Sequence, residues 1–126
     1  MAFLKRFANK REKGDYIEQQ TQRFLEKRQL QLIEKNYNKP TGEIDLIMLD
    51  DDVVTFVEVR YRASDSHGHA VETVNRQKQK KLIKTSLLFL QENILYQTSP
   101  CRFDIVGVST YNGQLKFDWL KNAFYE

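Results

Sequence analysis

The segment from residue 42 to residue 61 constrains the fold of this chain more than any other part of its sequence. Two runs rich in aliphatic and β-branched residues, 42–49 and 53–61, flank three consecutive aspartates. This pattern is typical of a β-hairpin whose strands are joined by a short acidic turn. If the second and third aspartates form a two-residue loop, Asp50 lies opposite Val53, and the pairing of the remaining residues follows.

That register places charged residues opposite one another at the open end of the hairpin. Asp45 faces Glu58, and Glu43 faces Arg60. Because side chains alternate between the faces of a strand, we expect these four groups to share one face. Both faces also carry apolar residues: Ile47, Leu49, Val54 and Phe56 on the same face, and Ile44, Leu46, Met48, Val57 and Val59 on the opposite one. Charged groups in such a sheet are costly unless they are paired or bind a metal, which predicts a functional site.

The rest of the chain predicts helices and strands on both sides of the hairpin. Apolar spacing indicates helices over residues 14–27 and 71–93, and alternating or apolar runs indicate strands over 29–37, 103–109 and 114–119. Asn112-Gly113 is a strong turn signal between the last two strands, and residues 62–70 read as a polar loop. This order predicts an α/β fold, a mixed sheet flanked by helices. With 126 residues, we expect one domain over 14–126, preceded by a basic, flexible tail over 1–13.

Charge is distributed unevenly along the chain, whose formal net charge is +3. Two basic clusters lie before and after the hairpin: Lys5, Arg6, Lys10, Arg11 and Lys13 in the first, and Arg76, Lys78, Lys80, Lys81 and Lys84 in the second. Basic patches around an acidic centre suit a polyanionic substrate bound near a cation, so Arg76, Lys78, Lys80 and Lys81 are our candidate nucleic-acid contacts. Each cluster alone is equally consistent with a solvated surface.

The single cysteine, Cys101, excludes an internal disulfide, and we expect it to be a buried small side chain. The first residues lack the apolar core of a signal peptide, and no apolar run reaches membrane-spanning length. We therefore expect a cytoplasmic protein with no membrane partner.

The facing acids suggest a specific chemistry. Two carboxylates whose Cβ atoms are about 5 Å apart repel unless a cation lies between them. Oxygen ligands of this kind suit Mg²⁺ or Mn²⁺. Arg60 is a permanent cation that can stabilise charge on a phosphate but is a poor general base. Glu18, near the apolar side of the first helix, is a candidate outer ligand. The residues thus predict metal-assisted hydrolysis of a phosphodiester.

These residues also carry a resemblance to a known family. Gly42-Glu43-Ile44-Asp45, followed by Phe56-Val57-Glu58-Val59-Arg60, resembles the core of the PD-(D/E)XK nuclease superfamily, which has the restriction-endonuclease-like fold. More narrowly, the chain resembles the YraN family of small bacterial proteins, which is related to archaeal Holliday junction resolvases. The helix around Gly14 to Glu18, the helix start at Arg76 and the run Cys101–Val106 extend the match over most of residues 14–124.

The resemblance implies roles for individual residues. Asp45 and Glu58 would be metal ligands, with the main-chain carbonyl of Val59 as a third. Glu18 would be an accessory acid, Lys78 or Gln79 would reach the site from the second helix, and Arg60 stands where the superfamily usually has lysine. Ile44 replaces the usual proline, which changes little. Arginine in place of lysine restricts proton transfer, and so bears on turnover more than on binding.

The predicted function is a Mg²⁺- or Mn²⁺-dependent endonuclease acting on DNA, on branched or processed DNA, with a homodimer as the assembly that the resemblance to resolvases implies. The alternative is a nucleic-acid-binding accessory module that keeps the nuclease fold with little or no turnover. A protein-binding adaptor is a third hypothesis.

Some residues keep two interpretations. Asp45 and Glu58 can be solubilising charges on an edge strand, with Arg60 as their salt-bridge partner. Asp104 is either a further site acid or a structural group. His67 and His69 are either a short metal clip or solvated loop residues.

Overall fold

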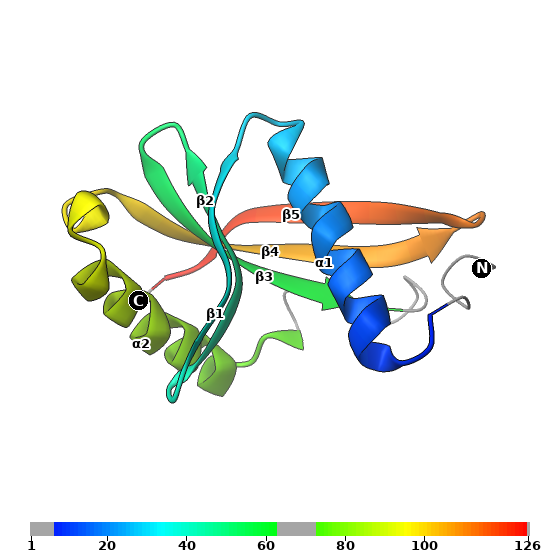
Figure 1. Cartoon of the computed structure of the whole chain (residues 1–126), viewed down its shortest axis with the longest axis horizontal. Coiled ribbons are helices and arrows are strands. Elements are labelled where there is room, and N and C mark those ends of the chain that lie inside the picture. Colours follow the sequence, from blue (N-terminus) through cyan, green and yellow to red (C-terminus); the bar gives the residue numbers. More distant parts are fainter. Residues whose placement is uncertain (1–6, 63–72, 126) are drawn as a thin grey trace.

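The computed structural model describes residues 7–62 and 73–125, and its centre is one five-stranded sheet. The elements in chain order are α1 (Lys10–Glu26), β1 (Gln31–Lys39), β2 (Gly42–Asp50), β3 (Val53–Tyr61), α2 (Arg76–Glu92), the short 3₁₀ helix η3 (Ile94–Tyr96), β4 (Cys101–Tyr111) and β5 (Gln114–Phe124). Figure 1 shows the sheet between the two long helices, with α1 crossing one face and α2 lying against the other.

The strands lie in sequence order, β1-β2-β3-β4-β5, and their directions are mixed. Neighbouring strands are antiparallel except for β3 and β4, which are parallel and are connected through α2. A parallel pair needs a crossover of this kind, since a tight turn cannot return the chain to the starting edge. The predicted fold class, an α/β fold with a restriction-endonuclease-like mixed sheet flanked by helices, is confirmed.

Several boundaries differ from the prediction; α2, for example, begins at Arg76 rather than at residue 71. α1 begins at Lys10 rather than Gly14, because the side chain of Asn9 accepts a hydrogen bond from the main-chain N–H of Glu12 at 2.8 Å and caps the helix. Residues 10–13, assigned to the tail from sequence, are therefore helical. β5 continues five residues beyond the predicted end at Trp119. Residues 1–6 of the tail, and most of the predicted 62–70 loop with its two histidines, lie outside the described residues.

The turns of the sheet follow their sequence signals. Asn112 and Gly113 have φ values of 49° and 80°, both left-handed, as a tight hairpin turn between β4 and β5 requires. Asp51 has a φ of 53° in the predicted two-residue loop between β2 and β3. The paired residues of these two strands run from Asp50–Val53 to Leu46–Val57, which confirms the predicted register.

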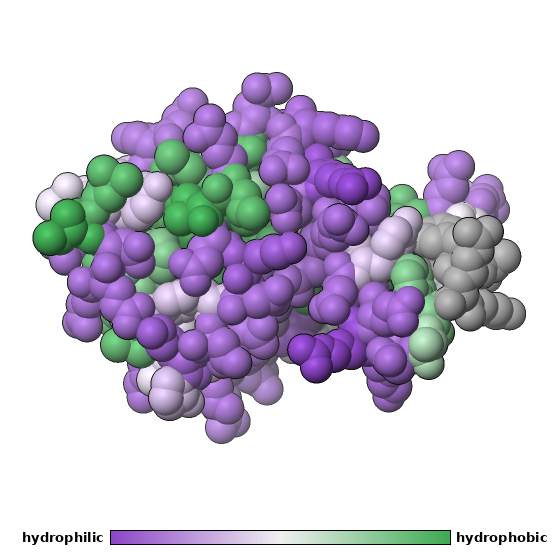
Figure 2. All heavy atoms as spheres, viewed as in Figure 1, coloured by the Kyte–Doolittle hydropathy of each residue, from purple (hydrophilic) through white to green (hydrophobic). Residues whose placement is uncertain are grey.

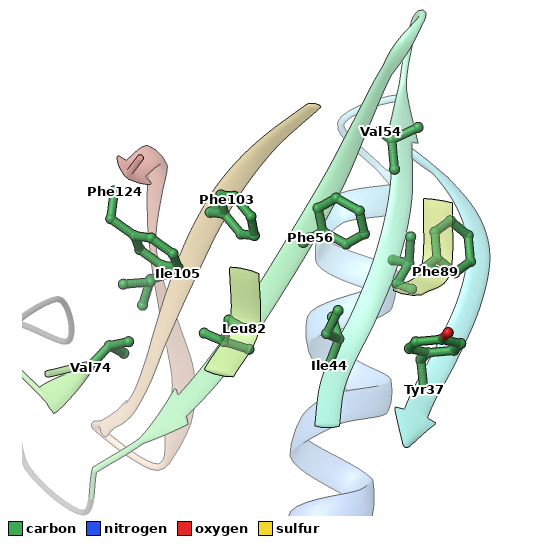
Figure 3. Close-up of a cluster of buried hydrophobic side chains, with 11 residues drawn as sticks. Tyr37, Ile44, Val54, Phe56, Val74, Leu82, Phe89, Phe103, Ile105 and Phe124 are labelled. Carbon is green, nitrogen blue, oxygen red and sulfur yellow. The ribbon is translucent and has the colours of Figure 1, made fainter. Parts of the chain in front are cut away.

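Each face of the sheet packs against one helix. The α2-side core, drawn in Figure 3, contains aromatic residues from four strands and from α2: Tyr37, Phe56, Phe89, Phe103 and Phe124, together with Ile44, Ile47, Val54, Val74, Leu82 and Ile105. The α1-side core comprises Ile17, Leu25, Leu30, Leu46, Met48, Val57, Val106 and Val108. Because both faces are covered, a charged side chain on the central strands is held between two apolar layers.

Ile44 packs on the opposite face of the sheet from the one predicted for it. Regular alternation places it with Leu46 and Met48, but it packs in the α2-side core and those two pack in the α1-side core. The alternation therefore breaks at Asp45. Opposite Asp45 in the β1–β2 register lies Asn36, whose φ of 53° interrupts the extended conformation of β1.

The molecular surface is mainly hydrophilic on the face shown in Figure 2, and apolar residues gather where η3 follows α2. Ile94 and Leu95, in η3, are 83% and 77% exposed. Within residues 7–62 and 73–125, neither long helix has the length and apolar composition needed to cross a membrane.

Candidate functional site

Asp45 and Glu58 lie directly beyond the last pair of the β2–β3 ladder, Leu46–Val57. Asp45 Oδ2 accepts a hydrogen bond from the main-chain N–H of Val59 at 2.8 Å. A side chain of β2 thus satisfies this donor of β3, which fixes the carboxyl of Asp45 at the open end of the hairpin. The site forms where main-chain pairing between the two central strands gives way to side-chain contact.

The two carboxyls interact strongly. The side chain of Glu58 is only 7% exposed. Burial and, after it, the charge of Glu58 raise the pKa of Asp45 to about 7, against the lowering effect of the Val59 N–H. A hydrogen bond between the two acids adds to the rise, and such a bond needs a proton on one of them. The two acids that were predicted to face each other therefore lie close together, and their proximity favours a proton on one of them.

Two cations meet the same oxygen of Glu58. Arg60 Nη2 lies 2.9 Å from Oε2 of Glu58. Lys78, in the first turn of α2, places its Nζ 3.7 Å from the same oxygen. Lys78 reaches the site, as predicted. The side-chain amide of Gln79 instead donates a hydrogen bond to the main-chain carbonyl of Val74 at 3.0 Å. This bond holds the amide at the start of α2.

The predicted sharing of one face by four charged groups is wrong in part. Glu58 pairs with Arg60 and with Lys78 of α2, whereas Glu43 and Asp45 line a hollow on the α1 side. The break in alternation at Asp45 explains this split, because it turns the start of β2 relative to β3. Within the acid pair, Asp45 therefore borders the hollow on the α1 side, and Glu58 contacts the two cations.

Glu18 enters the site from α1. It lines a hollow of about 320 Å³, which we call the acid hollow, together with Arg11, Gly14, Asp15, Ile17, Asn36, Glu43, Asp45, Val59 and Tyr61. Burial raises the pKa of Glu18 to about 7, and the nearby charges of Asp45, Glu43 and Asp15 contribute in that order. Glu18 therefore lies in the same hollow as Asp45 and Glu43, and its role as an accessory acid stays a prediction.

Sequence reasoning overlooked other polar residues of α1. Arg11, Asp15, Glu18 and Gln22 lie at intervals of four, three and four residues, so they form one stripe of the helix. Their spacing was the available signal, but a polar stripe also describes any solvated helix face. The structure shows that all four line hollows between α1 and the sheet.

The remaining nucleic-acid candidates lie on α2. Arg76, Lys80 and Lys81 are exposed, and the first turn of this helix contains no acid. The side chain of Asn75 caps the helix by accepting from the main-chain N–H of Lys78 at 2.8 Å. A basic helix surface thus begins next to Glu58, on the opposite side of the sheet from the acid hollow.

Asp104 and Cys101 have simpler explanations. Asp104 is fully buried and accepts hydrogen bonds from Arg102 Nε, Trp119 Nε1 and the main-chain N–H of Asn122 at 2.9–3.2 Å. It is therefore structural, and it stabilises the irregular pairing between β4 and β5.

Cys101 is exposed, contrary to the expectation that it is buried, because it lies at the first position of β4.

The interpretation of the acid pair as edge-strand charges is also wrong. β2 and β3 are the second and third strands of the five, and each has neighbours on both sides. Edge strands carry charges to prevent pairing with other chains, a purpose that interior strands do not have. The ion pair between Arg60 and Glu58 exists, but it lies inside the sheet.

Fold and site define a class of protein: an α/β domain with a restriction-endonuclease-like sheet and two facing acids at the open end of its central hairpin. The profile of Uncharacterised protein family UPF0102 matches residues 17–108. The chain belongs to this family, and the resemblance to the YraN family is confirmed.

Individual relatives agree with the family match. The chain is 46% identical over 119 residues to a UPF0102 protein of Aliivibrio salmonicida (strain LFI1238), covering 94% of this chain and 95% of the relative. It is 45% identical over 111 residues to a UPF0102 protein of Ectopseudomonas mendocina (strain ymp), covering 88% and 92%. With a UPF0102 protein of Stutzerimonas stutzeri (strain A1501) it shares 50% identity over 96 residues, covering 75% and 79%.

Proposed function

We propose that this protein is a Mg²⁺- or Mn²⁺-dependent endonuclease that hydrolyses phosphodiester bonds of branched or processed DNA. The observation that carries the proposal is the contact between the carboxyls of Asp45 and Glu58 inside the sheet. Burial opposes ionisation of both groups, and two ionised carboxylates at this distance would repel each other. Acids that a fold holds together against such a cost are typical of sites that bind a cation or transfer protons.

The donor atoms fit a hard divalent cation. Asp45, Glu58 and the main-chain carbonyl of Val59 would hold it, and Mg²⁺ commonly uses one or two carboxylates while water and phosphate oxygens complete its shell. Among residues 7–62 and 73–125, no three side chains of histidine, cysteine, aspartate or glutamate form a closed metal cluster. A set of two carboxylates leaves positions for a substrate. When bound, the ion supplies positive charge to the phosphate and lowers the pKa of its water.

Arg60 is suited to the phosphate. Its Nε is buried and has no hydrogen-bond acceptor within the described residues, while its Nη2 forms an ion pair with Glu58 at 2.9 Å. A phosphate oxygen beside the site would satisfy this donor, and the permanent charge would stabilise the developing negative charge. Because arginine does not give up its proton, Glu18, with its pKa raised to about 7, is the group that would accept the proton of the attacking water.

The exposed basic residues of α2 would hold the DNA backbone. Arg76, Lys80 and Lys81 follow one another on the helix that brings Lys78 to Glu58. Contacts of this kind position a polyanion without reading its sequence, and they weaken steeply with salt.

DNA as substrate and a single cysteine suit a cytoplasmic location. A homodimer would bring two sites to a branched duplex, and sedimentation equilibrium measures whether it forms.

The test is cleavage of a branched DNA substrate with Mg²⁺ and with Mn²⁺ by the wild type and two variants. Asp45→Ala and Glu58→Ala should each lower the rate by at least a hundredfold while circular dichroism shows a folded domain. Asp52→Ala is the matched control, because it removes an exposed acid from the turn of the same hairpin. Wild-type activity in both site variants would refute the assignment of the acid pair.

One observation favours a second candidate, the nucleic-acid-binding accessory module with little or no turnover. Arg60 holds Glu58 in an ion pair, so any cation must compete with a guanidinium for this ligand. The module predicts salt-sensitive DNA affinity that survives Asp45→Ala, and no cleavage by the wild type in either metal. Fluorescence anisotropy with labelled DNA at several salt concentrations, next to the cleavage assay, separates the two functions.

A further inference from the structure

A second hollow lies beside the acid hollow, between α1 and β1. This α1 pocket has a volume of about 500 Å³ and is lined by Phe7, Arg11, Glu12, Asp15, Tyr16, Glu18, Gln19, Gln22, Lys35, Asn36 and Leu46. Four of these residues, Arg11, Asp15, Glu18 and Asn36, also line the acid hollow. The two hollows are therefore neighbours. Gln22 lies about one helical turn, ~5.4 Å, beyond Glu18, so an occupant of the α1 pocket would be about one nucleotide away from the acid pair.

The charge of the α1 pocket does not favour a phosphate as its occupant. Its wall contains three acids, Glu12, Asp15 and Glu18, against two basic residues, Arg11 and Lys35, and the pKa of Glu18 is raised to about 7. A wall whose acids balance or outnumber its bases holds a phosphate less well than the exposed basic residues on α2 do. The group that enters this pocket is expected to be uncharged and able to donate hydrogen bonds to carboxylates.

The other wall residues suit a flat, polar ring. The rings of Phe7 and Tyr16 lie with their centroids 5.0 Å apart at a tilt of 39°. Gln19, Gln22 and Asn36 contribute side-chain amides, and the amide of Gln22 donates a long hydrogen bond of 3.3 Å to Glu26. Aromatic rings stack on nucleobases, and amides pair with the donor and acceptor atoms on base edges. A pocket of this volume is within the usual range for small-molecule sites.

We propose that the α1 pocket binds one unpaired nucleobase of the substrate strand, next to the phosphate that is cleaved. This inference rests on the proposed function and narrows its substrate class. A base within a duplex is stacked and paired and cannot enter a pocket in the protein. The substrate therefore carries an unpaired nucleotide at the cleavage point, as forks, flaps and junctions do, and a continuous duplex is a poor substrate.

The experiment measures base binding without cleavage. Forked DNA that carries 2-aminopurine at one position at a time, in the arm next to the fork, is titrated with the full chain in EDTA. Stacking quenches 2-aminopurine, so we expect emission to fall severalfold at one position beside the fork. Gln22→Ala and Tyr16→Leu should abolish this position-specific change and weaken binding by roughly tenfold, in line with the loss of one stacked base. Gln20→Ala, on the same helix but outside the pocket lining, should leave it unchanged.

The outcomes separate the two proposals. Binding of the forked DNA without any position-specific change, or a change that survives both pocket variants, refutes the base pocket and leaves the nuclease function standing. Equal affinity for the fork and for a continuous duplex also refutes the base pocket. Failure to bind any DNA at low salt refutes both. Thermal unfolding of each variant, followed by circular dichroism, shows that the domain is folded in every comparison.

Discussion

Replacing Asp45 with asparagine should stabilise the domain, although it removes a residue of the candidate site. Burial and the charge of Glu58 raise the pKa of Asp45 from 3.8 to about 7. A difference of about three pH units corresponds to ~4 kcal/mol at ~1.4 kcal/mol per unit. Asp45 is only partly buried, and asparagine can still accept the hydrogen bond from Val59. We therefore expect a gain of about 2 kcal/mol in the free energy of unfolding.

The gain should depend on pH with a definite sign. Below about pH 4 the Asp45 carboxyl carries its proton in both the folded and the unfolded state, and the substitution changes little. Between about pH 4 and pH 7 the unfolded chain loses this proton and the folded chain keeps it, so the stability of the wild type falls as the pH rises. Above pH 7 the difference is complete. Glu18 also has a pKa of about 7, and the charge of Asp45 contributes to this rise, so the substitution lessens the penalty at Glu18 as well and adds to the gain at high pH.

Urea unfolding of the two proteins at pH 5 and pH 8, followed by circular dichroism, measures this difference. We expect the advantage of Asp45→Asn to be about 2 kcal/mol at pH 8 and clearly smaller at pH 5. Mg²⁺ should then stabilise the wild type but not the variant, because a ligand stabilises only the state that binds it. Asp52→Asn, in the exposed turn, is the control. An advantage independent of pH, or a loss of stability at pH 8, would refute the reasoning.

Three other substitutions test separate parts of the structure. Asp104→Asn should destabilise the domain by about 3 kcal/mol, because it breaks a buried network of charged partners; Trp119, the only tryptophan, reports the change by fluorescence. Gly42→Ala should cost about 1–2 kcal/mol in thermal unfolding, because φ is +152° and the new Cβ would lie 3.2 Å from Thr85 Oγ1; an unchanged midpoint would contradict this. Arg60→Gln should raise Mg²⁺ affinity about fivefold (~1 kcal/mol) in calorimetry, since the metal no longer competes with the guanidinium, and weaker binding would disprove that competition.

The fold and the centre of the site were predictable because local rules determine them. Alternation of apolar residues and a two-residue acidic turn are enough to fix the register of β2 and β3, and that register alone brings Asp45 next to Glu58. Lys78 was also placed correctly, on the strength of the family resemblance. These features depend on short segments of chain or on a known motif.

The errors concern features that depend on tertiary contacts. The face of Ile44 follows from the left-handed conformation of Asn36 on a neighbouring strand, which no pattern within β2 reveals. The structural role of Asp104 required knowledge that Trp119 and Asn122 return beside it. The polar stripe of α1 was visible in the sequence, but only the packing of that helix against the sheet distinguishes a pocket wall from a solvated face.

The parallel pairing of β3 with β4 has a consequence for how the site is assembled during folding. Both members of the acid pair belong to one hairpin, and hairpins close in about 1–10 μs. Val54 pairs with Cys101 only after the whole crossover through α2 has formed, and such long-range contacts form slowly. The two carboxyls therefore meet while Arg60, on the same strand as Glu58, is already present, and Lys78 joins Glu58 only later. Mild acid, which lets the two carboxyls share a proton, should accelerate this early step.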